Sequence, residues 1–84
     1  MTYQVILPKS PQKELDRLPD KMAERILDAL AGLKTQPRPP GGKKLRGENA
    51  WRIRVGDFRV IYEIHDRVLQ VIVVTIGHRR EVYR

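Results

Sequence analysis

The sequence predicts an α+β domain in which two N-terminal helices pack on one face of a small, mainly antiparallel sheet. Apolar residues recur at helical spacing between residues 22 and 33, as in an amphipathic helix. Apolar and polar residues alternate through residues 51–64, as in paired strands with one buried face. The proline- and glycine-rich segment 36–42 separates these two patterns and fits only a loop. Helices followed by a run of strands are typical of this class.

Length and composition limit the functions that the chain can have. Its 84 residues, 40% hydrophobic and 32% charged, indicate a single domain over residues 1–84 rather than a disordered tail. The longest apolar run, residues 71–74, is far too short to span a membrane. The absence of cysteine excludes a disulfide scaffold, a thiolate zinc site and a cysteine nucleophile. The N-terminal residues do not resemble a signal peptide, so we expect a cytoplasmic protein with no membrane partner.

The first predicted elements are short and are bounded by prolines. Residues 3–7 alternate as a strand would, and Pro8 ends them. Ser10 followed by Pro11 predicts the start of a helix, with Ser10 as its N-cap and Pro11 at its first helical position.

The second predicted helix begins beside Asp20, which can cap it, and ends between Gly32 and Thr35. We interpret its apolar stripe as core. The stripe consists of Met22, Ile26, Leu30 and Leu33. Strand-like segments follow around Leu45 and at 51–55, 58–64 and 69–76. The last segment is nearly all apolar, as suits a central strand covered on both faces, and the predicted order is β-α-α-β-β-β.

A tight hairpin is predicted to join residues 51–55 to residues 58–64. Gly56 and Asp57 form a two-residue turn signal with glycine first, and this turn fixes the register with Val55 opposite Phe58. One face then carries only apolar and aromatic side chains and must lie under the helices. These residues are Trp51, Ile53, Val55, Phe58, Val60, Tyr62 and Ile64.

The opposite face of the hairpin carries Arg52, Arg54 and Arg59, with Arg54 directly across from Arg59. Like charges opposite each other destabilise a sheet. The arginines either splay into water beside carboxylates or form a site for phosphate, which guanidinium groups bind in forked geometry. The formal net charge is +7, of which +5 lies in residues 43–84. This imbalance favours a polyanionic partner, with RNA, DNA, anionic lipid and an acidic protein as candidates.

The last predicted strand leads through Gly77 into a basic tail. This tail contains His78, Arg79, Arg80 and Tyr83. If the last strand pairs antiparallel with residues 58–64, its end returns to Arg59. We therefore expect the tail to join the arginine cluster.

Three segments of the second half carry motifs in a fixed order. They are residues 44–47 (KLRG), 51–62 (WRIRVGDFRVIY) and 77–83 (GHRREVY). Together with the preceding strand and two helices, they resemble the RelE/ParE superfamily of bacterial toxin–antitoxin toxins over nearly the whole chain. The resemblance implies a compact sheet-and-two-helix fold and a cognate, acidic, RelB-like antitoxin. For the RelE branch, which the matches favour, it implies cleavage of mRNA in the ribosomal A site.

In the RelE branch, basic residues on both sides of the hairpin turn, an arginine beyond the last strand and a C-terminal tyrosine form the active surface. The resemblance therefore implies catalytic roles for Arg52, Arg54, Arg59, Arg79 and Tyr83. Arg80 could replace Arg79, because the tail is shorter than that of the family archetype. The archetype has lysines where this chain has Arg52 and Arg54. An arginine effectively never loses its proton, so Arg54 is a poor general base.

The implied chemistry is attack of an RNA 2′-hydroxyl on the adjacent phosphorus, with the arginines stabilising the developing charge. An imidazole can carry a proton near neutral pH, which makes His78 a further catalytic candidate, and Tyr83 could stack on a base or contact a phosphate. The expected RNA-binding residues are Lys43, Lys44, Arg46 and Arg80. We expect no metal and no small-molecule cofactor, because the sequence suggests no carboxylate–histidine cluster.

Two other functions remain compatible with the sequence. The ParE branch shares the fold but inhibits DNA gyrase, and an RNA-binding module without activity would also present a basic face. A neighbouring gene for a small acidic protein would favour either toxin branch over a bare binding module.

Overall fold

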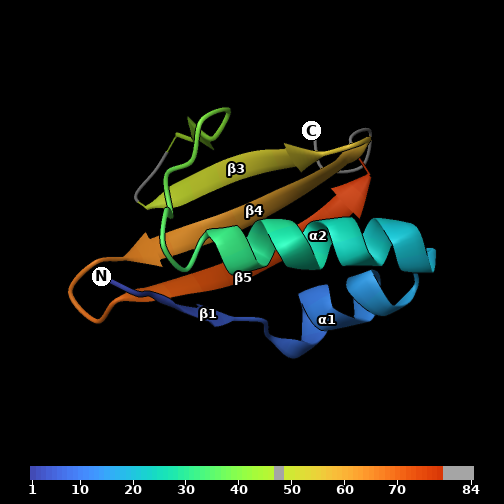
Figure 1. Cartoon of the computed structure of the whole chain (residues 1–84), viewed down its shortest axis with the longest axis horizontal. Helices are drawn as coiled ribbons and strands as arrows, with labels where there is room; N and C mark the ends of the chain where they lie inside the picture. Colours follow the sequence, from blue (N-terminus) through green and yellow to red (C-terminus); the bar gives the residue numbers. More distant parts are fainter. Residues whose placement is uncertain (47–48, 79–84) are drawn as a thin grey trace.

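A computed structural model describes residues 1–46 and 49–78, and it has the predicted α+β class (Figure 1). Two helices come first and most of the sheet follows them. The elements are β1 (Gln4–Ile6), α1 (Lys9–Asp16), α2 (Asp20–Gly32), β2 (Lys43–Lys44), β3 (Ala50–Val55), β4 (Phe58–His65) and β5 (Gln70–His78). The strand expected around Leu45 is the two-residue β2, which makes the order one strand longer than β-α-α-β-β-β.

The sheet has the order β1-β5-β4-β3-β2, and its pairs are antiparallel except for the parallel pair of β1 and β5. β5 is therefore a central strand, as predicted. The expectation that it is covered on both faces is wrong, because Val74 remains 44% exposed. Both helices pack on one face of the sheet, and the opposite face, on which Val74 is exposed, has no helical layer (Figure 1).

The core lies between the two helices and the apolar face of the sheet. The register predicted for the hairpin is confirmed from Trp51 opposite Tyr62 to Val55 opposite Phe58. The predicted core face is confirmed as well: five of its residues are buried, and Trp51 and Phe58 pack against them half-buried. Those five are Ile53, Val55, Val60, Tyr62 and Ile64, and they meet Leu15, Ile26, Leu30 and Leu33 from the helices and the turn after α2.

The helix starts differ from the prediction, because each helix begins directly after a proline. Pro8 and Pro19 occupy the N-cap positions without a side-chain cap, and their carbonyls accept the first helical hydrogen bonds. Ser10 is thus inside the first turn of α1, and Asp20 is the first residue of α2 rather than its cap. The fixed φ of proline suits the start of a helix. Asp20 still favours α2, because an acidic side chain there complements the helix dipole.

The hairpin turn packs so closely against α2 that a side chain at Gly56 would be crowded. Gly56 has a φ of +59°, which glycine adopts without strain. A Cβ at this position would lie 3.0 Å from Cε of Met22. Within the described residues, neither helix is long and apolar enough to cross a membrane.

Candidate functional site

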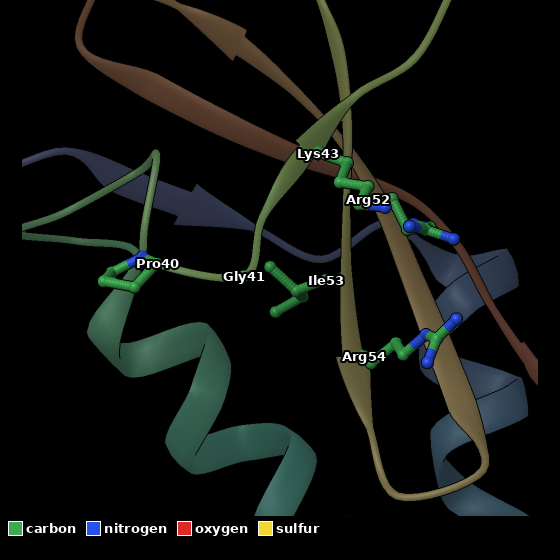
Figure 2. Close-up of a pocket in the computed structure, with 6 residues that line it drawn as sticks. All are labelled: Pro40, Gly41, Lys43, Arg52, Ile53 and Arg54. Carbon is green, nitrogen blue, oxygen red and sulfur yellow. The ribbon is translucent and has the colours of Figure 1, made fainter.

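Basic side chains from three neighbouring strands share the face of the sheet that lies away from the helices. Arg54 of β3 is paired with Arg59 of β4, and Lys43 of β2 is paired with Arg52. Paired residues point to the same face, so we call Lys43, Arg52, Arg54 and Arg59 the arginine face. Figure 2 shows Arg52 and Arg54 extending to one side of β3 and Ile53 to the other.

The arginine face is less open than the sequence suggests. Arg54 and Lys43 are exposed, but Arg52 is only 7% exposed and Arg59 only 1%. Arg59 is paired with Gly77 of β5, which has no side chain to occupy the space beside it. Both Arg52 and Arg59 have interaction partners in the folded chain, as buried charges require. Arg52 and Arg59 are therefore built into the domain, whereas Arg54 and Lys43 extend into solvent.

A shallow pocket of about 370 Å³ borders the arginine face. It lies between β3 and the end of the proline-rich loop at residues 36–42, and it is lined by Pro40, Gly41, Lys43, Arg52, Ile53 and Arg54 (Figure 2). β2 is paired with β3 only at Trp51 and Arg52. Within the described chain, the edge of β3 beyond Arg52 has no strand partner.

The proline-rich loop is tied to the sheet by contacts that the sequence did not predict. Tyr62 is completely buried, and its hydroxyl donates a hydrogen bond of 2.8 Å to the carbonyl of Pro37. Arg38 forks onto Asp66 with hydrogen bonds of 2.9 and 3.4 Å, and its guanidinium carbon lies 5.5 Å from the centroid of the Trp51 ring. No local sequence signal connects these residues, since the loop and its anchors are far apart in the chain.

The electrostatics of these anchors agree with their geometry. Burial raises the pKa of Tyr62 to about 12, so its hydroxyl keeps its proton and donates at physiological pH. The hydrogen bond from Arg38, followed by that from Tyr3, lowers the pKa of Asp66. Asp66 is therefore an anion that holds Arg38 in place.

His78 is not brought to the arginine face. It is paired with Phe58, so its ring lies on the helix side of the sheet, and the two ring centroids are 5.6 Å apart in an edge-on arrangement. His78 lines a second pocket of about 300 Å³ together with Glu14 of α1 and Arg17, the residue that follows this helix. The end of β5 does return to the hairpin as predicted, but it is Gly77 that pairs with Arg59.

The other predicted residues divide into two groups. Lys44 is paired with Trp51, which places it on the opposite face from Lys43, and Arg46 is exposed beyond β2. Arg79, Arg80 and Tyr83 lie outside the described residues. Among those described, no group of three or more histidines and carboxylates could hold a metal.

Comparison with known proteins identifies the class to which this fold and basic face belong. Residues 5–83 match the sequence model of the ParE toxin of type II toxin–antitoxin systems, parDE. The chain belongs to this family and is a toxin component of such a system. The resemblance to the RelE/ParE superfamily is thereby confirmed.

The chain is similar to curated toxins named RelE and RelG. The chain is 32% identical to toxin RelE of Mycobacterium tuberculosis, with 98% of this chain and 87% of that protein covered. It is 28% identical to toxin RelG of the same organism, with 100% and 99% covered.

Solved structures share the fold over most of its length. A chain from the archaeal RelE–RelB complex of Pyrococcus horikoshii superposes with a TM-score of 0.86 and 30% identity, covering 94% of this chain and 97% of that one. A chain from the RelBE2 toxin–antitoxin complex of Mycobacterium tuberculosis gives a TM-score of 0.80 and 27% identity, covering 94% and 100%.

Proposed function

We propose that this toxin is a ribosome-dependent endoribonuclease that cleaves mRNA in the ribosomal A site. The observation that carries the proposal is the arginine face, in which three arginines and Lys43 converge on one rigid hairpin and its short flanking strand. Guanidinium groups fixed on paired strands suit a phosphate whose negative charge grows during a reaction. The relatives named toxin RelE and toxin RelG support the same activity.

In the proposed reaction, the 2′-oxygen of one nucleotide attacks the adjacent phosphorus. A bond forms between that oxygen and phosphorus, and the bond from phosphorus to the 5′-oxygen of the next nucleotide breaks. The 2′-hydroxyl loses its proton and the leaving 5′-oxygen gains one. Arg52, Arg54 and Arg59 stabilise the charge that develops on the phosphate oxygens. Arg59 is only 1% exposed in the free chain, so it stabilises this charge from inside the protein rather than from its surface.

Proton transfer is the step that the arginine face cannot perform. A guanidinium effectively never gives up its proton, so none of the three arginines serves as the base. His78 lies on the helix side of the sheet, and we do not assign the transfer to it. We propose that Arg79, with Arg80 as the alternative, adds a further positive charge and that Tyr83 stacks on a base or contacts a phosphate. The ribosome then positions the mRNA for attack, and free RNA is cut poorly.

We propose that the protein partner of this toxin is a cognate antitoxin of RelB type, rich in acidic residues. The net charge of +7 supports an acidic partner, and the similar structures include RelE–RelB complexes. Co-expression with the product of the neighbouring gene tests this assignment. The two proteins should co-purify at physiological salt, and failure to do so would remove the acidic antitoxin from the proposal.

Primer extension on translated mRNA after induction tests the nuclease itself. We expect new 5′ ends inside translated regions, absent when translation initiation is blocked and absent in an Arg59→Gln variant. The family description names ParE, which favours inhibition of DNA gyrase as the second candidate. Gyrase supercoiling of plasmid DNA separates the two, because only a ParE-type toxin would block it. Intact mRNA together with blocked supercoiling would replace the nuclease by the gyrase inhibitor.

A further inference from the structure

The proline-rich loop is fixed immediately before it delivers β2 to the sheet. Tyr62 holds the carbonyl of Pro37 at 2.8 Å, and Arg38 is clamped between Asp66 and the Trp51 ring. A turn closed by a 2.9 Å hydrogen bond from the Gly42 nitrogen to the Pro39 oxygen follows. Gly41 in this turn has a φ of +86°, which only glycine adopts readily. Lys43 comes directly after the turn.

β2 itself makes few interactions that would fix its position on the sheet. It is only two residues long, and both residues are lysines. The register sets Lys43 opposite Arg52, and like charges at such a position repel each other. Figure 2 shows the two side chains next to each other on the same side of β3. The two-residue ladder is extended by one bond of 2.9 Å from the Leu45 nitrogen to the Ala50 oxygen, and this bond lies on the far side of β2 from the loop. These few hydrogen bonds oppose the repulsion, and on the Lys43 side the remaining restraint comes from the loop.

We propose that Tyr62 and Arg38 are positioning residues that hold Lys43 on the arginine face, and thereby set how many RNA phosphates this face neutralises. The inference rests on the function proposed above. Neither residue needs to touch RNA: Tyr62 is buried on the helix side of the sheet, and the guanidinium of Arg38 is engaged by Asp66. They act through the backbone between Pro37 and Lys43.

The test uses a substitution that changes no charge. Tyr62→Phe keeps the ring in the core and removes only the hydroxyl that holds Pro37. Binding of a short single-stranded oligoribonucleotide is measured at several salt concentrations. The slope of log K against log salt is negative, and its steepness falls by about 0.7 for a single strand when one phosphate is no longer neutralised; below, a lower slope means a less steep one. We expect Tyr62→Phe to lower the slope by that amount, as Lys43→Ala does, and we expect no further decrease in the double variant.

Controls separate positioning from simple loss of folded protein. A smaller folded fraction would reduce affinity equally at every salt concentration and leave the slope unchanged. Lys9→Ala, on the exposed start of α1, removes the same charge as Lys43→Ala but should not alter the slope. Arg38→Lys keeps its charge but cannot fork onto Asp66, and it should lower the slope as Tyr62→Phe does. Amide hydrogen exchange at Lys43 and Lys44 should quicken in both anchor variants.

The outcomes distinguish this inference from the proposed function. If the unaltered chain binds RNA while Tyr62→Phe and Arg38→Lys keep its slope and its exchange protection, the positioning role is wrong and the function stands. If the unaltered chain binds no RNA on its own or on the ribosome, the proposed function fails and the inference fails with it.

Discussion

Arg54 and Arg59 face each other across β3 and β4 but differ in exposure, so they should differ in their contribution to the proposed cleavage. Arg54 is exposed and Arg59 is 1% exposed. Replacing each by glutamine removes the charge and keeps much of the side-chain volume. We expect Arg59→Gln to slow cleavage about 10³-fold and Arg54→Gln about fivefold.

The magnitudes follow from the surroundings of each guanidinium. Attack by the 2′-oxygen adds about one unit of negative charge to the phosphate. Two unit charges 4 Å apart interact by about 4 kcal/mol at an effective dielectric constant of about 20, and by about 1 kcal/mol in bulk water. The first value suits buried Arg59 and the second suits exposed Arg54. At about 1.36 kcal/mol for each factor of ten, these energies correspond to three decades and less than one decade in rate.

The assay is single-turnover cleavage of an mRNA bound to a programmed ribosome, with a thermal melt of each variant to normalise for folded protein. Arg59→Lys serves as the control, because it keeps the charge and should recover part of the rate. Equal losses in Arg54→Gln and Arg59→Gln, or a larger loss at Arg54, would refute the reasoning from burial. Full activity of folded Arg59→Gln would refute the nuclease assignment itself.

Three further predictions concern the scaffold. Gly56→Ala should destabilise the domain by about 1–2 kcal/mol, seen as a lower denaturation midpoint, because alanine is strained at a φ of +59° and would press on Met22. Leu69 has a φ of +53°, so Leu69→Asn should be more stable than Leu69→Ala by about 1 kcal/mol in a urea titration, since both lose the leucine but only asparagine tolerates this conformation. The pKa of Asp66 is lowered in the folded chain by Arg38, so its contribution to stability is present above the unfolded pKa of about 3.9 and is lost as the pH falls further. Between pH 6 and pH 3 the melting temperature should therefore fall less steeply in Asp66→Asn than in the unaltered chain. Parallel curves of melting temperature against pH would contradict this.

The hairpin was predictable because its information is local. The turn at Gly56 and Asp57 fixes the register, and alternation then assigns every side chain to a face. The arginine cluster and the core face followed from the same two facts, and both are confirmed. The stripe on α2 was equally local, because its spacing follows from the helical repeat alone.

What escaped prediction depends on contacts between distant segments. The parallel pairing of β1 with β5 joins the two ends of the described chain, and no turn between them encodes it. The bond from Tyr62 to Pro37 joins a core strand to a loop whose path only the fold defines. The burial of Arg59 is not encoded in β4 itself, because the alternation of its residues indicates only the face on which a side chain lies. The side taken by His78 follows from a pairing whose exact register the sequence does not encode locally.

The arrangement of the strands also sets a time at which this toxin becomes complete during its synthesis. β5 emerges last among the described strands, yet it lies in the middle of the sheet, between β1 and β4. β1 therefore waits without a partner while the helices and the hairpin are translated, and Arg59 lacks its neighbour Gly77 until the end of β5 has left the exit tunnel. A nascent chain that stops before β5 contains all four residues of the arginine face, but its β4 lacks the neighbouring strand that completes the sheet. Under the function proposed above, the order of translation delays action on the ribosome that makes this toxin, and the antitoxin has that interval in which to be present.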